Sequence, residues 1–78
     1  MSPTIFSARG LRFFFSLEES RMHVHVLGEE GEAKVWIQPH IEVATVNRLS
    51  RRTLGFVIRQ IEEREDEIRE AWDRHFRR

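Results

Sequence analysis

Apolar and polar residues alternate through the first half of the chain, and this pattern predicts β-strands. Successive side chains of a strand point to opposite faces, so the alternation in residues 11–17 places its apolar members on one side: Leu11, Phe13, Phe15 and Leu17. Residues 22–27 and 32–37 alternate in the same way, and shorter runs at 4–8 and 41–46 predict two further strands. Polar or glycine-containing segments separate the runs. We therefore expect neighbouring strands to pair antiparallel as a meander.

The second half of the chain has the spacing of a helix. Apolar residues recur three, four or seven positions apart, and Ser50 precedes them as a suitable N-cap: Leu54, Ile58, Ile61, Ile68, Trp72 and Phe76. A helix over residues 50–78 would be about 40 Å long, whereas a six-residue strand spans about 20 Å. The helix must therefore either extend beyond the sheet or break. An extension would leave Ile68, Trp72 and Phe76 to be buried by another surface.

These patterns predict one α+β domain over residues 1–78. Residues 1–46 would form an antiparallel sheet of four to five strands, and residues 50–78 one long C-terminal helix packed on one face. A core of this size gives little net stability, so an oligomer or a partner protein is expected.

The turn Gly28-Glu29-Glu30-Gly31 sets the register of the central hairpin. Val24 then lies opposite Val35 and Val26 opposite Ala33, which makes an apolar face for the helix. The other face carries His23, His25, Lys34 and Trp36, and the neighbouring strands extend it with Arg12, Phe14, Ile5 and Ser7. No second helix is predicted to cover this face, and its exposed aromatic residues are typical of an interface.

Composition narrows the classes of function. The chain has no cysteine, which excludes disulfides, thiolate metal sites and thiol nucleophiles, and its formal net charge is zero. A zero net charge argues against strong non-specific binding of nucleic acid. No apolar run reaches the roughly 18 residues of a membrane span, and the start of the sequence lacks a secretory pattern. We expect a cytoplasmic protein, and nothing in the sequence indicates a cofactor.

Three specific activities compete for the polar face. His23 and His25 could hold a divalent metal, for which Glu32, Glu42 or His40 would have to supply a third ligand. Lys34 lies across from His25, and a cation there opposes metal binding. Alternatively, either histidine could act as the base of a ribonuclease while Lys34 or Arg12 stabilises the phosphate. The third activity is non-catalytic binding of nucleic acid. Aromatic side chains of the sheet would stack on bases, and Arg48, Arg51 and Arg52 would extend the basic surface.

The chain resembles a small bacterial family catalogued as a domain of unknown function. The similar stretches run in order through most of the sequence: Pro3-Thr4-Ile5-Phe6, Leu11-Arg12-Phe13-Phe14-Phe15, His23-Val24-His25-Val26, Gly31-Glu32-Ala33-Lys34-Val35-Trp36-Ile37, Leu49-Ser50, Ala71-Trp72 and His75-Phe76. The resemblance implies a cytoplasmic protein with a small protein partner encoded by a neighbouring gene, as in toxin–antitoxin modules. Glu18-Glu19-Ser20-Arg21-Met22 replaces the family's proline-rich run with its extra histidine, which weakens the metal and catalytic hypotheses.

Our leading hypothesis is a non-enzymatic interaction protein of such a two-gene module. It would bind a small protein partner, or a second copy of itself, through the histidine-bearing sheet face and the helix stripe. The residues expected to make these contacts are Phe14, Trp36, Ile68, Trp72 and Phe76. A ribonuclease toxin using His23, His25, Lys34 and Arg12 is the first alternative, and a metal-binding His-x-His pair is the second.

Overall fold

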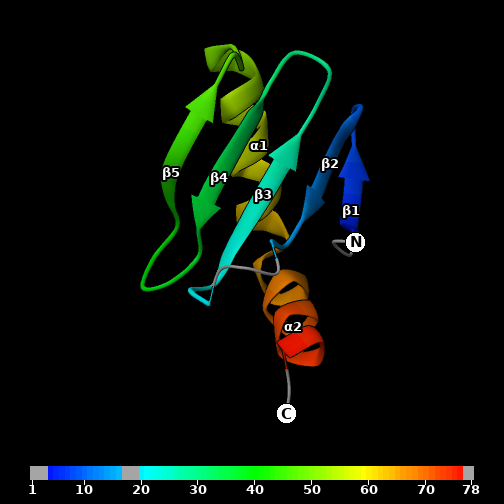
Figure 1. Cartoon of the computed structure of the whole chain (residues 1–78), viewed down its shortest axis with the longest axis vertical. Helices are drawn as coiled ribbons and strands as arrows, with labels where there is room; N and C mark the ends of the chain where they lie inside the picture. Colours follow the sequence, from blue (N-terminus) through cyan, green and yellow to red (C-terminus); the bar gives the residue numbers. More distant parts are fainter. Residues whose placement is uncertain (1–3, 17–19, 77–78) are drawn as a thin grey trace.

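The computed structural model describes residues 4–16 and 20–76, and these form a five-stranded antiparallel sheet followed by two helices (Figure 1). The strands lie in sequence order across the sheet. Their bounds are β1 Thr4–Ala8, β2 Leu11–Phe14, β3 His23–Leu27, β4 Glu32–Trp36 and β5 Glu42–Asn47, and the helices are α1 Arg51–Glu63 and α2 Glu65–Phe76. The predicted α+β class and the meander are confirmed. Leu17, expected on the core face of the second strand, lies outside the described residues.

The central hairpin has the predicted register. His23 pairs with Trp36, Val24 with Val35, His25 with Lys34 and Val26 with Ala33. The turn closes with the Gly28 N–H donating to the Gly31 carbonyl at 2.9 Å. Because side chains alternate along each strand, this register separates the valines from His25, Lys34 and Trp36.

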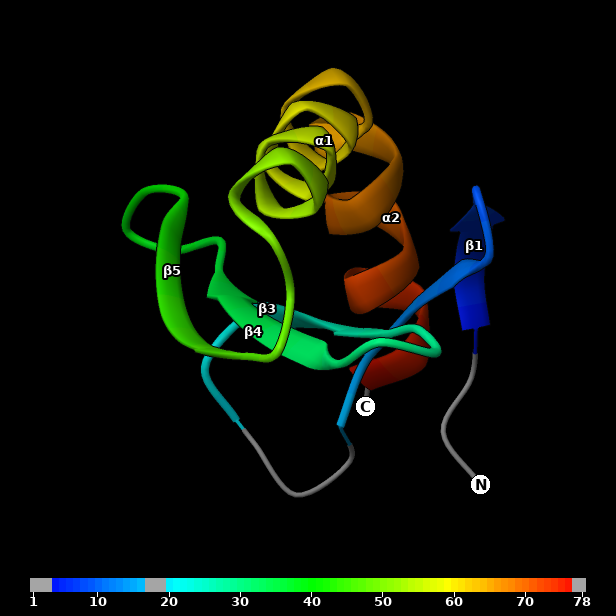
Figure 2. The ribbon, with the colours of Figure 1, turned by 90° about the horizontal axis from the view of Figure 1, so that it is seen from above.

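The sheet curves around α1, so that β1 and β5 rise on either side of the helix (Figure 2). Val57 and Ile61 of α1 are fully buried against the inner face of the sheet. That inner face contributes Phe13, Val24, Val26, Ala33, Val35 and Ile37, all at most 1% exposed. The core therefore lies between α1 and the inner face of the sheet, as the strand pattern predicts.

The helical segment breaks at Arg64, which settles the choice between extension and breakage. The Arg64 N–H still donates to the Gln60 carbonyl at 3.0 Å, but its φ of −114° and ψ of 23° are not helical. From there α2 turns toward the end of the sheet where β3 begins (Figure 1).

The break explains why the helix stripe is covered by the chain itself. Ile68 is 0% and Trp72 8% exposed, because α2 packs its apolar side under the end of the sheet. The expectation that these two residues meet a partner is therefore wrong. Phe76 is half-buried, with its ring centroid 4.1 Å from that of Trp72.

Ile5 also differs from the expectation. The pairing of β1 with β2 shifts register between Thr4 and Phe6. As a result Ile5 packs against the core, beside Phe15 and Ala71, and does not join the polar face. Within residues 4–16 and 20–76, no helix is long and apolar enough to cross a membrane.

Candidate functional site

The side of the sheet turned away from α1 carries a group of aromatic and basic side chains, which we call the outer face. It comprises Arg12, Phe14, Arg21, His25, Lys34 and Trp36. Phe14 and His25 stack across β2 and β3, with ring centroids 5.1 Å apart and planes 12° from parallel. The Arg12 guanidinium carbon lies 4.3 Å from the centroid of the Phe14 ring. One cation and one imidazole therefore flank a half-buried phenyl ring.

A second group of stacked side chains surrounds Trp36. The guanidinium carbon of Arg21 lies 4.1 Å from its ring centroid, and the Lys34 Nζ lies 4.6 Å from it. The Arg21 Nε also donates to the Gln38 carbonyl at 2.9 Å, which fixes the side chain in place. Cation–aromatic contacts of this kind hold long basic side chains in defined positions and contribute roughly 0.5–1 kcal/mol each at exposed sites.

Sequence reasoning missed Arg21, although a signal for it was available. The hairpin register pairs residues whose numbers sum to 59, as in His23 with Trp36. Extending this register by two pairs beyond His23 and Trp36 places Arg21 opposite Gln38, on the same face as Trp36.

His25 lies within the outer face and is accessible. Its side chain is 29% exposed, and its Nε2 lies 3.4 Å from a carboxylate oxygen of Glu32. Lys34 is its partner across the strand pair, as the register predicts. His25 can therefore contact a ligand on the surface of the sheet.

His23 is 0% exposed, so the expectation that it shares an exposed face with His25 is wrong. The reason is the position of α2. The Trp72 ring packs edge-on against the imidazole with centroids 5.4 Å apart, and Phe15 lies 6.3 Å away. Strand alternation assigned the correct side of the sheet, but α2 covers that side where β3 begins.

Both ring nitrogens of His23 bond to the backbone. The Ser16 N–H donates to Nε2 at 2.9 Å, so Nε2 carries no proton. The proton is then on Nδ1, which donates to the Arg21 carbonyl at 2.8 Å. The imidazole thus joins the two sides of the connection between β2 and β3, and it has no nitrogen available for proton transfer or for a metal.

This arrangement removes His23 from both chemical hypotheses. The ribonuclease hypothesis retains only His25, Lys34 and Arg12, and the His-x-His pair cannot direct two free nitrogens at one ion. Among the residues that the structure describes, no three or more histidine, cysteine, aspartate or glutamate side chains form a group that could hold a metal.

The predicted basic extension lies apart from the outer face. Arg51 and Arg52 are exposed in the first turn of α1, at the end of the sheet farthest from His23. Arg48 is also exposed, with a φ of 68°, and it lies beside the acidic turn that contains Glu29 and Glu30. The acidic turn interrupts any positive surface here, so the three arginines do not continue the outer face.

Fold and surface together define a small α+β domain whose sheet is packed on its inner side and lined with cations and aromatic rings on its outer side. Residues 10–73 match the family described as Domain of unknown function (DUF4160), and the chain belongs to this family. The matched region includes the outer face, His23 and most of both helices. The comparisons with curated proteins and with solved structures give no match.

Proposed function

We propose that the protein is a non-enzymatic interaction module that binds a small protein partner through the outer face. The strongest supporting observation is that the rings of Phe14 and Trp36 are half-buried on this face. The basic side chains Arg12, Arg21 and Lys34 lie over them. Aromatic and arginine side chains are the residue types that contribute most to protein–protein affinity.

The chemistry of the outer face indicates the kind of partner. Arg12, Arg21 and Lys34 give it positive charge, while Phe14 and Trp36 give it flat apolar area. A complementary surface would carry carboxylates placed beside apolar side chains. Because the cations already rest on the rings, ordering them on binding costs less entropy than ordering free side chains.

From the resemblance to the small bacterial family we infer the identity of that partner. It is the small protein encoded by the neighbouring gene, and the pair would form a toxin–antitoxin-like module. A ribonuclease activity receives less support, because the backbone holds both ring nitrogens of His23. Of the two histidines proposed for that activity, only His25 could then transfer a proton. An acid–base mechanism needs a second group to return the proton to the leaving oxygen.

The test is a binding titration of this protein with its neighbour gene product by isothermal calorimetry. Trp36→Ala should weaken the complex by roughly thirtyfold or more, because an aromatic anchor at the centre of an interface contributes about 2 kcal/mol or more. Arg51→Ala is the matched control, since it removes an exposed cation outside the outer face. Absence of a complex, or equal affinities for Trp36→Ala and Arg51→Ala, would contradict the proposal.

Fluorescence offers a direct measure of the same contact. The chain has two tryptophans, so Trp72→Phe leaves Trp36 as the reporter on the outer face. Covering this ring should shift its emission to shorter wavelength as the partner is added. A growth assay adds the enzymatic comparison: expression that arrests growth with the native chain but not with His25→Ala would favour the ribonuclease alternative.

A further inference from the structure

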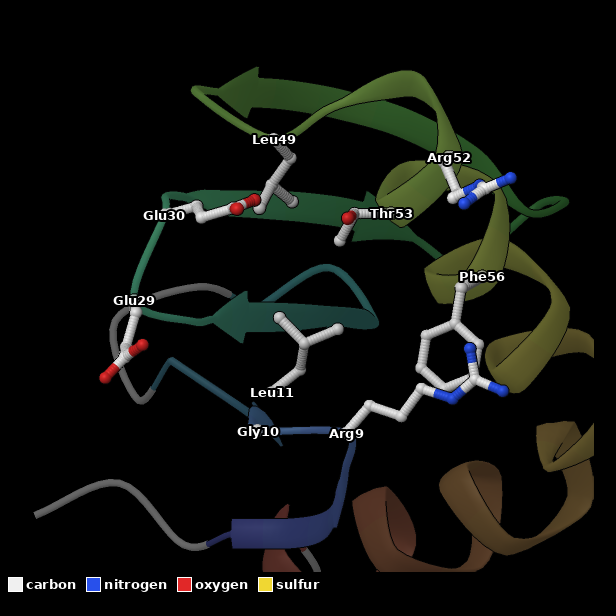
Figure 3. A pocket seen from close by; sticks show the side chains of 9 residues that line it. All are labelled: Arg9, Gly10, Leu11, Glu29, Glu30, Leu49, Arg52, Thr53 and Phe56. Carbon is white, nitrogen blue, oxygen red and sulfur yellow. The ribbon is translucent and has the colours of Figure 1, made fainter.

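A cleft lies at the end of the sheet opposite His23, and we call it the hairpin cleft. The β1–β2 turn, the β3–β4 turn and the start of α1 enclose it, with a cavity volume of about 570 Å³ (Figure 3). This volume falls within the range of roughly 300–1,000 Å³ that is usual for small-molecule sites. No residue of the outer face lines the hairpin cleft.

The floor and the two sides of the hairpin cleft differ in chemistry. Leu11, Leu49 and Phe56 supply apolar surface, and Leu11 points into the space between the two sides (Figure 3). Arg9 and Arg52 lie on the side of Phe56, whereas Glu29 and Glu30 lie on the opposite side. Positive and negative charge therefore face each other across an apolar floor.

Arg9 is held in an unusual conformation beside this space. Its φ of 51° is in the left-handed region, which a residue with a Cβ adopts at a cost, while the following Gly10 has a φ of 77°. The Arg9 guanidinium carbon lies 4.6 Å from the centroid of the Phe56 ring (Figure 3). The ring fixes the cation at the rim of the hairpin cleft, so an anion can meet it with little further ordering.

The charges of the hairpin cleft have no ion-pair partner in the described part of the chain. None of Arg9, Arg52, Glu29 and Glu30 forms an ion pair within residues 4–16 and 20–76. A ligand with one group of each charge can satisfy both sides at once.

We propose that the hairpin cleft binds a short peptide or amino acid with free ends and an apolar side chain. The carboxylate meets Arg9 and Arg52 at the start of α1, where the helix dipole also favours negative charge. The ammonium group meets Glu29 and Glu30, and the apolar side chain rests on Leu11, Leu49 and Phe56. This site is separate from the outer face and independent of the partner proposed for it.

The experiment uses the full ¹⁵N-labelled chain and three probes followed by amide chemical shifts: leucyl-leucine, its N-acetyl derivative and its C-terminal amide. Leucyl-leucine should shift the amides of Gly10, Leu11 and Thr53 with a dissociation constant of about 0.1–1 mM. Each blocked probe lacks one charge and should bind about tenfold more weakly.

Variants separate the two sides of the hairpin cleft. Arg9→Gln should weaken leucyl-leucine and the amine-blocked probe alike, whereas Glu30→Gln should leave the amine-blocked probe unchanged. Both positions are exposed, and Arg51→Gln, on the same helix turn as Arg52 but outside the lining, is the control. Three outcomes would overturn the proposal. The first is no saturable shift at a leucyl-leucine concentration of about ten times the expected dissociation constant. The others are equal affinity for all three probes and shifts confined to the outer face.

Discussion

Replacing His23 by alanine should destabilise the protein far more than replacing His25, although the two residues are only two positions apart on the same strand. Alanine at position 23 leaves the Ser16 N–H and the Arg21 carbonyl without the imidazole partners that lie 2.9 and 2.8 Å away. Each of these partly buried backbone groups costs about 1–2 kcal/mol when it loses its partner. Loss of the ring's packing against Trp72 and Phe15 adds about 1–2 kcal/mol.

With two such backbone groups and the packing loss, we expect His23→Ala to lower the free energy of unfolding by about 3–6 kcal/mol. Domains have about 0.05–0.15 kcal/mol of stability per residue, so a chain of 78 residues has about 4–12 kcal/mol in total. The variant should lose a large part of this. His25→Ala should cost less than about 1 kcal/mol, because its side chain is 29% exposed and its partner Glu32 is 3.4 Å away at the surface.

Urea unfolding followed by tryptophan fluorescence measures both effects, since Trp72 lies 5.4 Å from the His23 ring centroid. His23→Asn adds a graded comparison, because its amide nitrogen can still donate to the Arg21 carbonyl while the Ser16 N–H loses its acceptor. Its stability should fall between those of the native chain and His23→Ala. Stabilities of His23→Ala and His25→Ala within about 1 kcal/mol of each other would refute the structural role assigned to the buried imidazole.

Three further substitutions test how the turns and helix of the fold are built. Gly31→Ala should destabilise by at least about 2 kcal/mol, because a Cβ there would overlap the carbonyl oxygen of Asn47. Gly55→Ala should instead raise the melting temperature by about 5 °C, since its Cβ meets nothing within 4 Å and alanine favours the helix by about 1 kcal/mol. Ser50→Ala should cost about 1 kcal/mol by removing the oxygen that accepts the Thr53 N–H at 3.0 Å. Thermal and urea unfolding measure all three, and a stabilising Gly31→Ala or a neutral Ser50→Ala would contradict the respective contact.

Much of the fold could be predicted because its signals are local. The two-residue period of the strands and the glycine-bracketed turn together specify the pairing of His25 with Lys34 and of Val24 with Val35. The same parity indicates the outer face, and it would have included Arg21 had the register been extended two pairs beyond His23 and Trp36. The N-cap Ser50 and the apolar spacing of the second half likewise predict where helical structure begins.

The hairpin cleft could not be predicted in the same way. Its charged side chains come from the β1–β2 turn, the β3–β4 turn and α1, and no spacing along the sequence relates Arg9 to Glu30 or Phe56. The register shift at Ile5 is equally invisible to a strict alternation of side chains.

By itself, the order of apolar and polar residues determined the strand faces, the hairpin register and the helical character of the C-terminal third, because each depends on neighbours a few positions away. Only the tertiary structure decided that the helix breaks at Arg64 and that α2 packs under the end of the sheet. That packing buries Ile68 and Trp72 and covers His23. The burial of a residue depends on which distant segment packs against it. Two histidines with the same strand parity therefore differ in exposure and in the roles open to them.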